Sequence, residues 1–420
     1  MFMFENLHAG GINVTLSTKQ KSVLILAFSY FAYLFSYLGR NNYSTCILQI
    51  VNDTGISRAV AGSVTAAFSI CYAFGQLTTG FVIKKLSPVK VISFELITTA
   101  VINFIFPSAS SFSAMLILWA TNGIIQSTIL CSLTQIFVDN LKEPYLSKSA
   151  VLINTIGAVG GFLNYFIAWA LLKYSVWQST FLLSSILLFT FGIVWIFIMP
   201  KISQKFQSTE TVRTLKDENR HGFLSQIKKH GAFAGLLACL SVGALREGVA
   251  LWIPSYINDS FNIDAATSTF LTVFVPMLQI IGAFLSGTFA RKFYNLHIGA
   301  IISFIVSSLC MMCLFLFGNA SVYLTIFLFT CNSIAVTCGM SLYLSFFPLR
   351  FFDKNFTARV VGLSSFFIHT GDFLASIGIG YISESGSWSS VFASLFSIAT
   401  FAVLISVLGN IAHIKGEKNG

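Results

Sequence analysis

The sequence predicts an all-α membrane protein in which twelve transmembrane helices form two six-helix bundles, with both chain termini in the cytosol. Hydrophobic residues make up 55% of the 420 residues and charged residues only 10%. The mean hydropathy of +0.80 lies well above the range of water-soluble domains. The apolar residues gather into long runs, and a single long hydrophilic segment separates six of these runs from the other six. These observations predict a multi-pass protein of the cell membrane, either inner or plasma membrane.

Each apolar run is long enough to cross a bilayer. The hydrocarbon core is about 30 Å thick, and about 20 apolar residues in a helix cross it. Residues 1–20 contain no apolar core of a signal peptide, so we expect the first helix to direct insertion. The expected helices lie near residues 22–50, 58–83, 89–107, 113–137, 149–173, 179–199, 231–257, 265–290, 297–317, 321–346, 357–383 and 388–412.

The distribution of Lys and Arg predicts the orientation. With a cytosolic N-terminus, 21 of the 25 basic residues fall in cytosolic segments. Arg58 and Lys173 fall outside, and Arg40 and Arg246 fall within helices. This asymmetry follows the positive-inside rule. The net charge of +10 is therefore a topology signal, and because it is scattered over membrane-edge loops we expect no nucleic-acid partner.

The two halves of the chain resemble each other. The segments "GFVIKK" and "GTFARK" begin at Gly80 and Gly287, 207 residues apart, and Arg40 and Arg246 are 206 residues apart. Two features that repeat at nearly one offset indicate a duplication of six helices, whose halves face each other across a central cavity. We expect an N-terminal bundle at 1–199, a cytosolic linker at 200–230 and a C-terminal bundle at 231–420.

Arg40 and Arg246 are the main candidates for a binding site. An Arg at a helix centre costs about 2.5–3.5 kcal/mol on insertion scales, so something must offset this free energy. One explanation is a pair of ion bridges between helices, with Glu247 and Asp372 as the anions. The explanation we favour is that both guanidinium groups face a watery cavity and bind an anionic substrate, because their fork of donors matches phosphate or carboxylate.

Two tyrosines support an anion site at Arg40. Tyr33 and Tyr37 precede Arg40 by seven and three residues, so the three side chains share one stripe of a helix. Phenol groups beside a guanidinium form a wall suited to a small oxyanion. The alternative for these tyrosines is packing against lipid or against the protein core.

Three segments carry a family resemblance. "YLGRNNYS" in the first helix, "LREGVALWIPSYI" in the seventh and "ARVVGLSSFFIHTGDFLASIGIGYI" in the eleventh resemble the organophosphate:phosphate antiporters of the major facilitator superfamily, which include glycerol-3-phosphate and hexose-6-phosphate transporters. Helix count and linker position extend the resemblance over nearly the whole chain. It implies the major facilitator fold and alternating-access transport of a small organic anion, such as a sugar phosphate, in exchange for phosphate.

The resemblance also implies site residues. In the family, one Arg on the first helix and one on the seventh hold the phosphate, and Arg40 and Arg246 occupy these positions. Aromatic site positions of the family fall at Tyr33, Tyr37, Tyr72 and His369, and a site Lys of the family falls at Gln76.

The sequence also departs from the family pattern. The auxiliary Lys, His and Tyr positions hold Asn41, Gly157 and Gly243, and Lys84 stands where an Asp is usual. The two Arg positions are kept while the auxiliary cations are lost. Two other functions therefore stay open: a proton-coupled symporter of an organic anion such as a carboxylate, and a membrane receptor that binds such an anion without moving it.

Ionisable residues near the two Arg are candidates for coupling. His369 and Asp372 are three residues apart, on one face of the eleventh helix, and Glu247 follows Arg246. A carboxyl group beside a guanidinium can hold or release its proton according to whether substrate occupies the Arg, so Asp372 and Glu247 are the coupling candidates. The alternatives are a fixed ion bridge for Asp372 and an interhelical hydrogen bond for His369. We expect Glu95 to reach water at the cytosolic edge and assign it no role.

Other polar residues in the helices have two possible roles. Asn122 and Gln126 are one turn apart in the fourth helix, and Gln279 and Asn332 lie in the eighth and tenth. Each is either a hydrogen-bonding link between helices or part of a cavity wall. The glycines of Gly157–Gly161 allow close approach of helices.

The sequence contains no Gly-rich phosphate loop, nucleotide-binding fingerprint or hydrolytic triad. We therefore expect a protein that is not an enzyme, with no catalytic residues, no cofactor and no metal. We expect ion or substrate gradients to drive its transport. We also expect a monomer.

Overall fold

The computed structural model describes residues 17–82, 86–109, 111–142, 144–203, 227–228, 230–351 and 354–418. Within these ranges the regular structure is helical throughout. Most of the expected linker, the N-terminal residues before Ser17, and the "GFVIKK" side chains with Lys84 lie outside what the structure describes. In the described part of the chain, twelve helical segments are long and apolar enough to cross a membrane, which confirms the expected number.

Six of these segments precede the linker. The bounds are α1 (Thr18–Thr54), α2 (Arg58–Val82), α3 (Pro88–Ile105) with the short turn η2 (Phe106–Ser108), α4 (Phe112–Gln126) continuing into α5 (Ile129–Asn140), α6 (Tyr145–Leu172) and α7 (Gln178–Ile202).

Six more segments follow the linker, and two of them contain a π-helical turn. The bounds are α9 (Ala232–Gly243), η3 (Ala244–Gly248) and α10 (Val249–Phe261) as one span, α11 (Ala265–Thr272) with α12 (Phe274–Lys292), α13 (Leu296–Phe317), α14 (Val322–Ser341) with η4 (Leu342–Phe346) and α15 (Phe347–Phe351), α16 (Lys354–Ser385) and α17 (Trp388–Lys418).

The helices extend beyond their apolar runs. α1 begins at Thr18 and ends at Thr54, four residues outside the expected run at each end. Ser17 caps it, because the Ser17 hydroxyl accepts from the Gln20 backbone N–H and the Gln20 side chain accepts from the Ser17 N–H. Gly55 ends it with a φ of 68°, which favours glycine. A helix satisfies its own backbone, so it need not stop where the hydrocarbon does.

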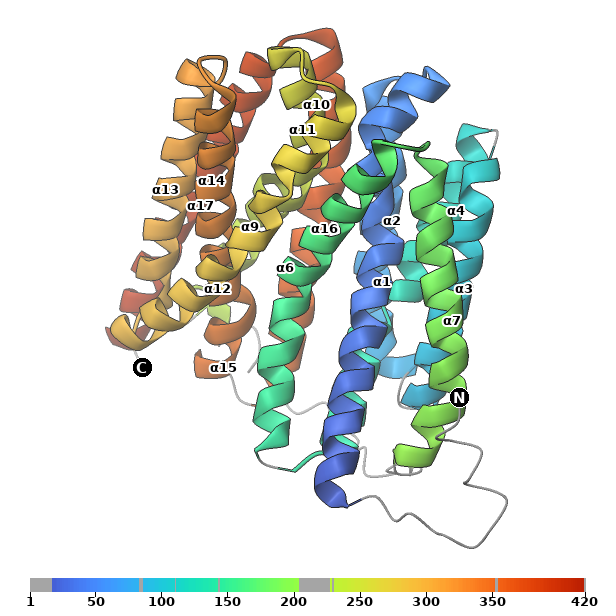
Figure 1. Ribbon diagram of the computed structural model, residues 1–420. Coiled ribbons are helices and arrows are strands. Elements are labelled where there is room, and N and C mark those ends of the chain that lie inside the picture. Colours follow the sequence, from blue (N-terminus) through green and yellow to red (C-terminus); the bar gives the residue numbers. More distant parts are fainter. Residues whose placement is uncertain are drawn as a thin grey trace, which may run out of the picture.

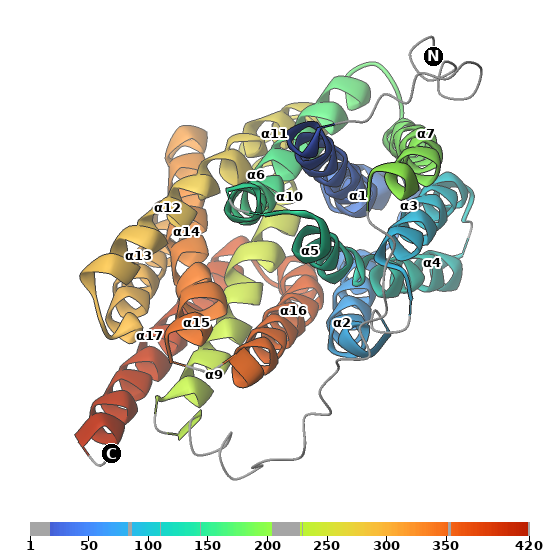
Figure 2. The same cartoon turned by 90° about the horizontal axis from the view of Figure 1, so that it is seen from below.

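The two groups of six helices lie side by side (Figure 1). The helix ends that hold Thr18 and Lys418 lie at the lower end of this view. α16 packs along α2, and α6 packs along α11 and α12. These two sets of helices supply most contacts between the halves, and α1 also touches α10 and α11. Figure 2, seen from below, shows these two interfaces on opposite sides of the α1 and α10 helices.

The halves are joined at the end opposite the termini. Arg58 at the start of α2 forms an ion pair of 2.6 Å with Asp259 near the end of α10. The rings of Trp169 in α6 and Phe270 in α11 have centroids 4.6 Å apart. In the predicted orientation this joined end faces the outside of the cell.

Gly161 permits the contact between α6 and α12. A Cβ atom at Gly161 would lie 2.8 Å from Pro276 Cβ, closer than two carbon atoms approach without displacement. Substitution of Gly161 by Leu should therefore push the two halves apart and lower the free energy of unfolding by roughly 1–3 kcal/mol, the usual effect of overpacking. Thermal unfolding of the purified protein in detergent measures this.

The matched control is Gly378→Leu, because a Cβ at Gly378 meets no atom within 4 Å. An equal melting temperature for the Gly161→Leu variant and this control would contradict the close contact.

Candidate anion-binding site

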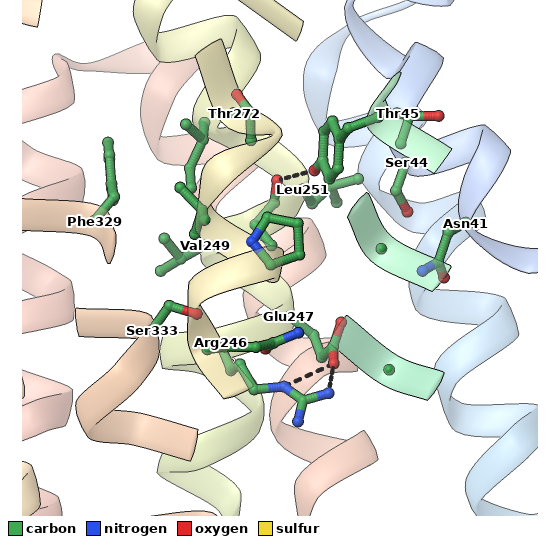
Figure 3. A pocket seen from close by; sticks show the side chains of 18 of the residues that line it. Asn41, Ser44, Thr45, Arg246, Glu247, Val249, Leu251, Thr272, Phe329 and Ser333 are labelled. Carbon is green, nitrogen blue, oxygen red and sulfur yellow. Dashed lines mark hydrogen bonds and ion pairs between the residues drawn. The ribbon is translucent and has the colours of Figure 1, made fainter. Parts of the chain in front are cut away.

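A cavity lies between the two halves. α1 and α6 form one wall, and η3, α10, α12 and α14 form the other. Figure 3 shows Asn41 and Ser44 facing the pair Arg246 and Glu247 across this space. The charged and amide side chains that line it are Arg40, Asn41, Arg246, Glu247, Gln279 and Asn332.

A second hollow adjoins the cavity on the α2 and α16 side. Arg40 and Glu247 line both spaces, and Ser69, His369 and Asp372 line only the second. Arg40 and Glu247 therefore lie between the cavity and the second hollow. Both spaces also contain ionisable side chains from the C-terminal six helices.

Aromatic rings hold Arg40. Its guanidinium carbon lies 4.6 Å from the ring centroid of Tyr37, 5.0 Å from that of Tyr72 and 5.6 Å from that of Phe68. Such cation–π contacts contribute about 0.5–2 kcal/mol each. Arg40 forms no ion pair with any described residue. Its positive charge is thus stabilised by ring faces, and no described carboxylate neutralises it.

Arg246 is paired with its own neighbour. Its Nε donates to Glu247 Oε1 at 2.8 Å, and its Nη2 donates to the same oxygen (Figure 3). Consecutive residues of an α-helix point about 100° apart. Here both belong to the π-helical turn η3, which has more residues per turn than an α-helix. Neighbouring side chains therefore point in more similar directions, and both line the cavity.

Asn332 supports this turn. Its Nδ2 donates to the Leu245 carbonyl at 2.9 Å, and its Oδ1 accepts from Ser307 at 2.7 Å. A π turn changes the hydrogen-bond partners of the backbone, and the amide of Asn332 satisfies a carbonyl oxygen there. Asn332 therefore serves both roles that the sequence left open, since it links helices and also lines the cavity.

The expected ion bridges between helices are not found for Glu247 or Asp372 among the described residues. Glu247 pairs with Arg246, but the two are neighbours in the same turn η3, so this pair is not the expected bridge between helices. Asp372 forms no ion pair with an Arg among the described residues. It is 6% exposed and accepts hydrogen bonds from Ser376 at 3.1 Å and from Ser69. Because Ser69 belongs to α2 and Asp372 to α16, this carboxyl group links the halves.

His369, Tyr72 and Gln76 lie in the same interface. The His369 and Tyr72 rings have centroids 4.6 Å apart. Gln76 donates to the Tyr72 hydroxyl at 3.2 Å and accepts from Ser365 of α16. The structure thus brings α2 residues against α16 residues beside Arg40.

Tyr33 lies behind Tyr37. The two rings have centroids 5.2 Å apart, and Tyr33 is only 6% exposed. Tyr37 lines the cavity and Tyr33 does not. Tyr33, Tyr37 and Arg40 therefore follow one another along α1 as expected, but only Tyr37 and Arg40 line the cavity.

Glu95 corrects the sequence analysis. It is fully buried, and its carboxyl oxygen Oε1 lies 2.6 Å from the Ser36 hydroxyl oxygen. It stands seven residues into α3, about 10 Å from the helix start, too deep to reach the membrane edge. The expectation that Glu95 meets water at the edge is wrong.

Sequence reasoning missed several hydroxyl groups. Ser44 lies one turn after Arg40, and Ser69 lies three residues before Tyr72. The spacing of these serines from Arg40 and Tyr72 places them on the same helix faces. Serine is common in transmembrane helices, however, so this spacing alone did not single them out. Of the amides left open, Gln279 lines the cavity, while Asn122 and Gln126 are fully buried and link helices.

Comparison with known proteins places the chain in a family. Residues 29–351 match the family described as Major Facilitator Superfamily. The chain is 22% identical over 400 residues to a glycerol-3-phosphate transporter of Bacillus subtilis (strain 168), covering 89% of this chain and 88% of the relative. It is 21% identical over 423 residues to a hexuronate transporter of the same organism, covering 96% and 97%. It is 21% identical over 298 residues to the membrane sensor protein UhpC of Escherichia coli (strain K12), covering 64% and 65%.

Solved structures agree on the fold. A bacterial homologue of the human lysosomal transporter Spinster, in an inward-facing and unoccupied conformation, aligns with a TM-score of 0.73 at 13% identity, covering 94% of this chain and 96% of that one. The nucleoside transporter NupG aligns with a TM-score of 0.69 at 16% identity, covering 94% and 99%. The chain therefore belongs to the major facilitator superfamily, as a multi-pass transporter of small molecules in the plasma membrane.

Proposed function

We propose that this transporter moves a small organic anion of the organophosphate class by alternating access, in exchange for inorganic phosphate. The observation that carries the proposal is that Arg40 from the first half and Arg246 from the second half line one cavity. The similarity to a glycerol-3-phosphate transporter supports the substrate class.

The geometry suggests how binding and movement are coupled. Two guanidinium groups repel each other in an empty cavity, and an anion between them attracts both. Because the two Arg come from different halves, binding of the anion lowers the free energy of the state in which the halves close around it.

Glu247 holds the place of the substrate in this conformation. Its Oε1 accepts two N–H groups of Arg246, the donors that a phosphate or carboxylate oxygen would use. An arriving anion must therefore displace Glu247 from Arg246. This exchange of one anion for another keeps Arg246 paired throughout and avoids leaving its charge bare.

A second function is proton-coupled symport of an organic anion such as a carboxylate. The buried Asp372 favours it, because Ser69 and Asp372 join the halves and a change in the proton content of the carboxyl group would alter that bond. The similarity to a hexuronate transporter fits a carboxylate substrate.

Counterflow in liposomes separates these functions. We expect labelled glycerol-3-phosphate to enter only when the liposomes contain phosphate or unlabelled glycerol-3-phosphate. Uptake into empty liposomes that requires an inward proton gradient would instead establish symport. Binding of the labelled anion without any flux would contradict both functions and identify a receptor.

Each central Arg should be required for binding. Arg40→Ala and Arg246→Ala should each weaken anion binding by roughly 2–5 kcal/mol, which is at least about thirtyfold. Binding of labelled glycerol-3-phosphate to purified protein measures this. Arg291→Ala is the matched control, because Arg291 is exposed at the end of α12. Wild-type binding by either central variant would contradict the two-Arg site.

Removal of the internal competitor should strengthen binding. Glu247→Gln keeps the size of the side chain and removes its charge, so the anion no longer displaces a carboxylate from Arg246. We expect the affinity for glycerol-3-phosphate to rise by roughly fivefold or more, since a hydrogen bond to a charged group contributes about 1.5–3 kcal/mol. Glu384→Gln on the exposed end of α16 is the control. Weaker binding by Glu247→Gln would show that Glu247 assists the anion.

A further inference from the structure

A buried polar cluster lies in the first half, beside the anion site. Glu95 of α3, Ser36 of α1, and Asn122 and Gln126 of α4 are each no more than 1% exposed. The Ser36 hydroxyl oxygen lies 2.6 Å from Glu95 Oε1 and 3.2 Å from Gln126 Oε1. A serine hydroxyl has one proton, so it can donate to only one of these two oxygens.

The backbone of Gly39 decides which oxygen receives that proton. The Gly39 carbonyl can only accept, so Asn122, at 3.2 Å, presents its Nδ2 to it. The Asn122 Oδ1 must then accept, and Gln126 donates to it from Nε2 at 3.1 Å. This leaves Gln126 Oε1 facing Ser36 as an acceptor. The Ser36 proton therefore points to Gln126, and the Ser36 lone pair points to Glu95.

The proton between Ser36 and Glu95 must then belong to Glu95. A carboxylic acid donates from Oε1 to the Ser36 oxygen, and Ser36, Asn122 and Gln126 then each keep their hydrogen bonds. An ionised Glu95 would take the Ser36 proton and leave the Gln126 oxygen without a donor. Glu95 Oε2 meets no hydrogen-bonding partner among the described residues. A buried carboxylate oxygen without a donor costs far more free energy than the carbonyl oxygen of a neutral acid.

The cluster adjoins Arg40. Ser36 precedes Arg40 by one turn of α1. α3 packs against α1, α4, α5 and α7. α4 has no titratable side chain, α5 has Cys131 and Asp139, and α7 has Lys201 in its last turn. On α1, Tyr33 and Tyr37 lie close to Ser36 in sequence, and Arg40 is the charged residue nearest to Ser36 along the helix.

We propose that Glu95 is a proton-binding site of this transporter, linked through Ser36 and α1 to the anion site at Arg40. Loss of the proton breaks the O–H bond of the acid, leaves the electron pair on the carboxylate and passes the proton to water when the packing around α3 opens. The resulting negative charge near Arg40 competes with the bound anion. The protonated acid therefore favours anion binding, and the carboxylate opposes it. This linkage rests on the proposed anion site, whereas the protonation of Glu95 does not.

Infrared spectroscopy of the purified protein tests the protonation. A protonated carboxyl group has a characteristic C=O stretching band, which shifts in heavy water. Carboxylates and glutamine side chains do not have this band. We expect this band near neutral pH in the wild type, where exposed carboxyl groups with a pKa of about 4 are ionised. Its Glu95 component should be absent from Glu95→Gln and kept in the control Glu384→Gln, whose altered side chain is exposed.

Ser36→Ala provides a second variant, because it removes the partner of the acid and should shift the frequency of the same band. Identical bands in the wild type, Glu95→Gln and Ser36→Ala would overturn the proposal.

Anion binding tests the linkage separately. The probe is glucuronate, whose carboxylate stays ionised from about pH 6 to about pH 9. We expect the wild-type affinity to fall roughly tenfold over this range and the affinity of Glu95→Gln to stay within about twofold. An equal fall in both proteins would overturn the linkage. If neither glucuronate nor glycerol-3-phosphate binds the wild type, the proposed anion site and its linkage fail, and the infrared band still decides whether Glu95 holds a proton.

Discussion

The constraint on which the rest depends is the presence of two permanent positive charges within the membrane-spanning region. Each guanidinium would be costly in hydrocarbon, and the fold offsets this cost in two ways. Arg40 lies against the rings of Tyr37, Tyr72 and Phe68, and Arg246 binds the carboxylate of Glu247. Both arrangements place the charge at a shared cavity. In the proposed function, an anion in this cavity meets one Arg without an ion pair among the described residues and one Arg whose partner it replaces.

The two halves contact each other at the end of the molecule away from the chain termini. The ion pair of Arg58 with Asp259 and the contact of Trp169 with Phe270 hold the halves together away from the termini. The interface of α2 with α16 carries polar bonds beside Arg40, from Ser69 to Asp372 and from Ser365 to Gln76. A movement of the halves must break or rearrange these bonds, so the ligand environment and the interface change together.

Most of the fold could be predicted from the sequence, and the site only in part. Apolar runs fix the number of helices because lipid demands them, and the rarity of charge in such runs singles out Arg40 and Arg246. The pairing of Arg246 with Glu247 could not be predicted, since it depends on the π turn η3, which has no simple sequence signal. Glu95 was misjudged because distance along a helix says nothing about a partner such as Ser36 on another helix.

The most direct test of the two-Arg site is a structure determined with an electron-dense oxyanion, such as tungstate, bound to the protein. The account predicts a single anion between the guanidinium groups of Arg40 and Arg246, with Glu247 turned away from Arg246. An anion that contacts only one of the two Arg, or that leaves the pair of Arg246 and Glu247 intact, would contradict it.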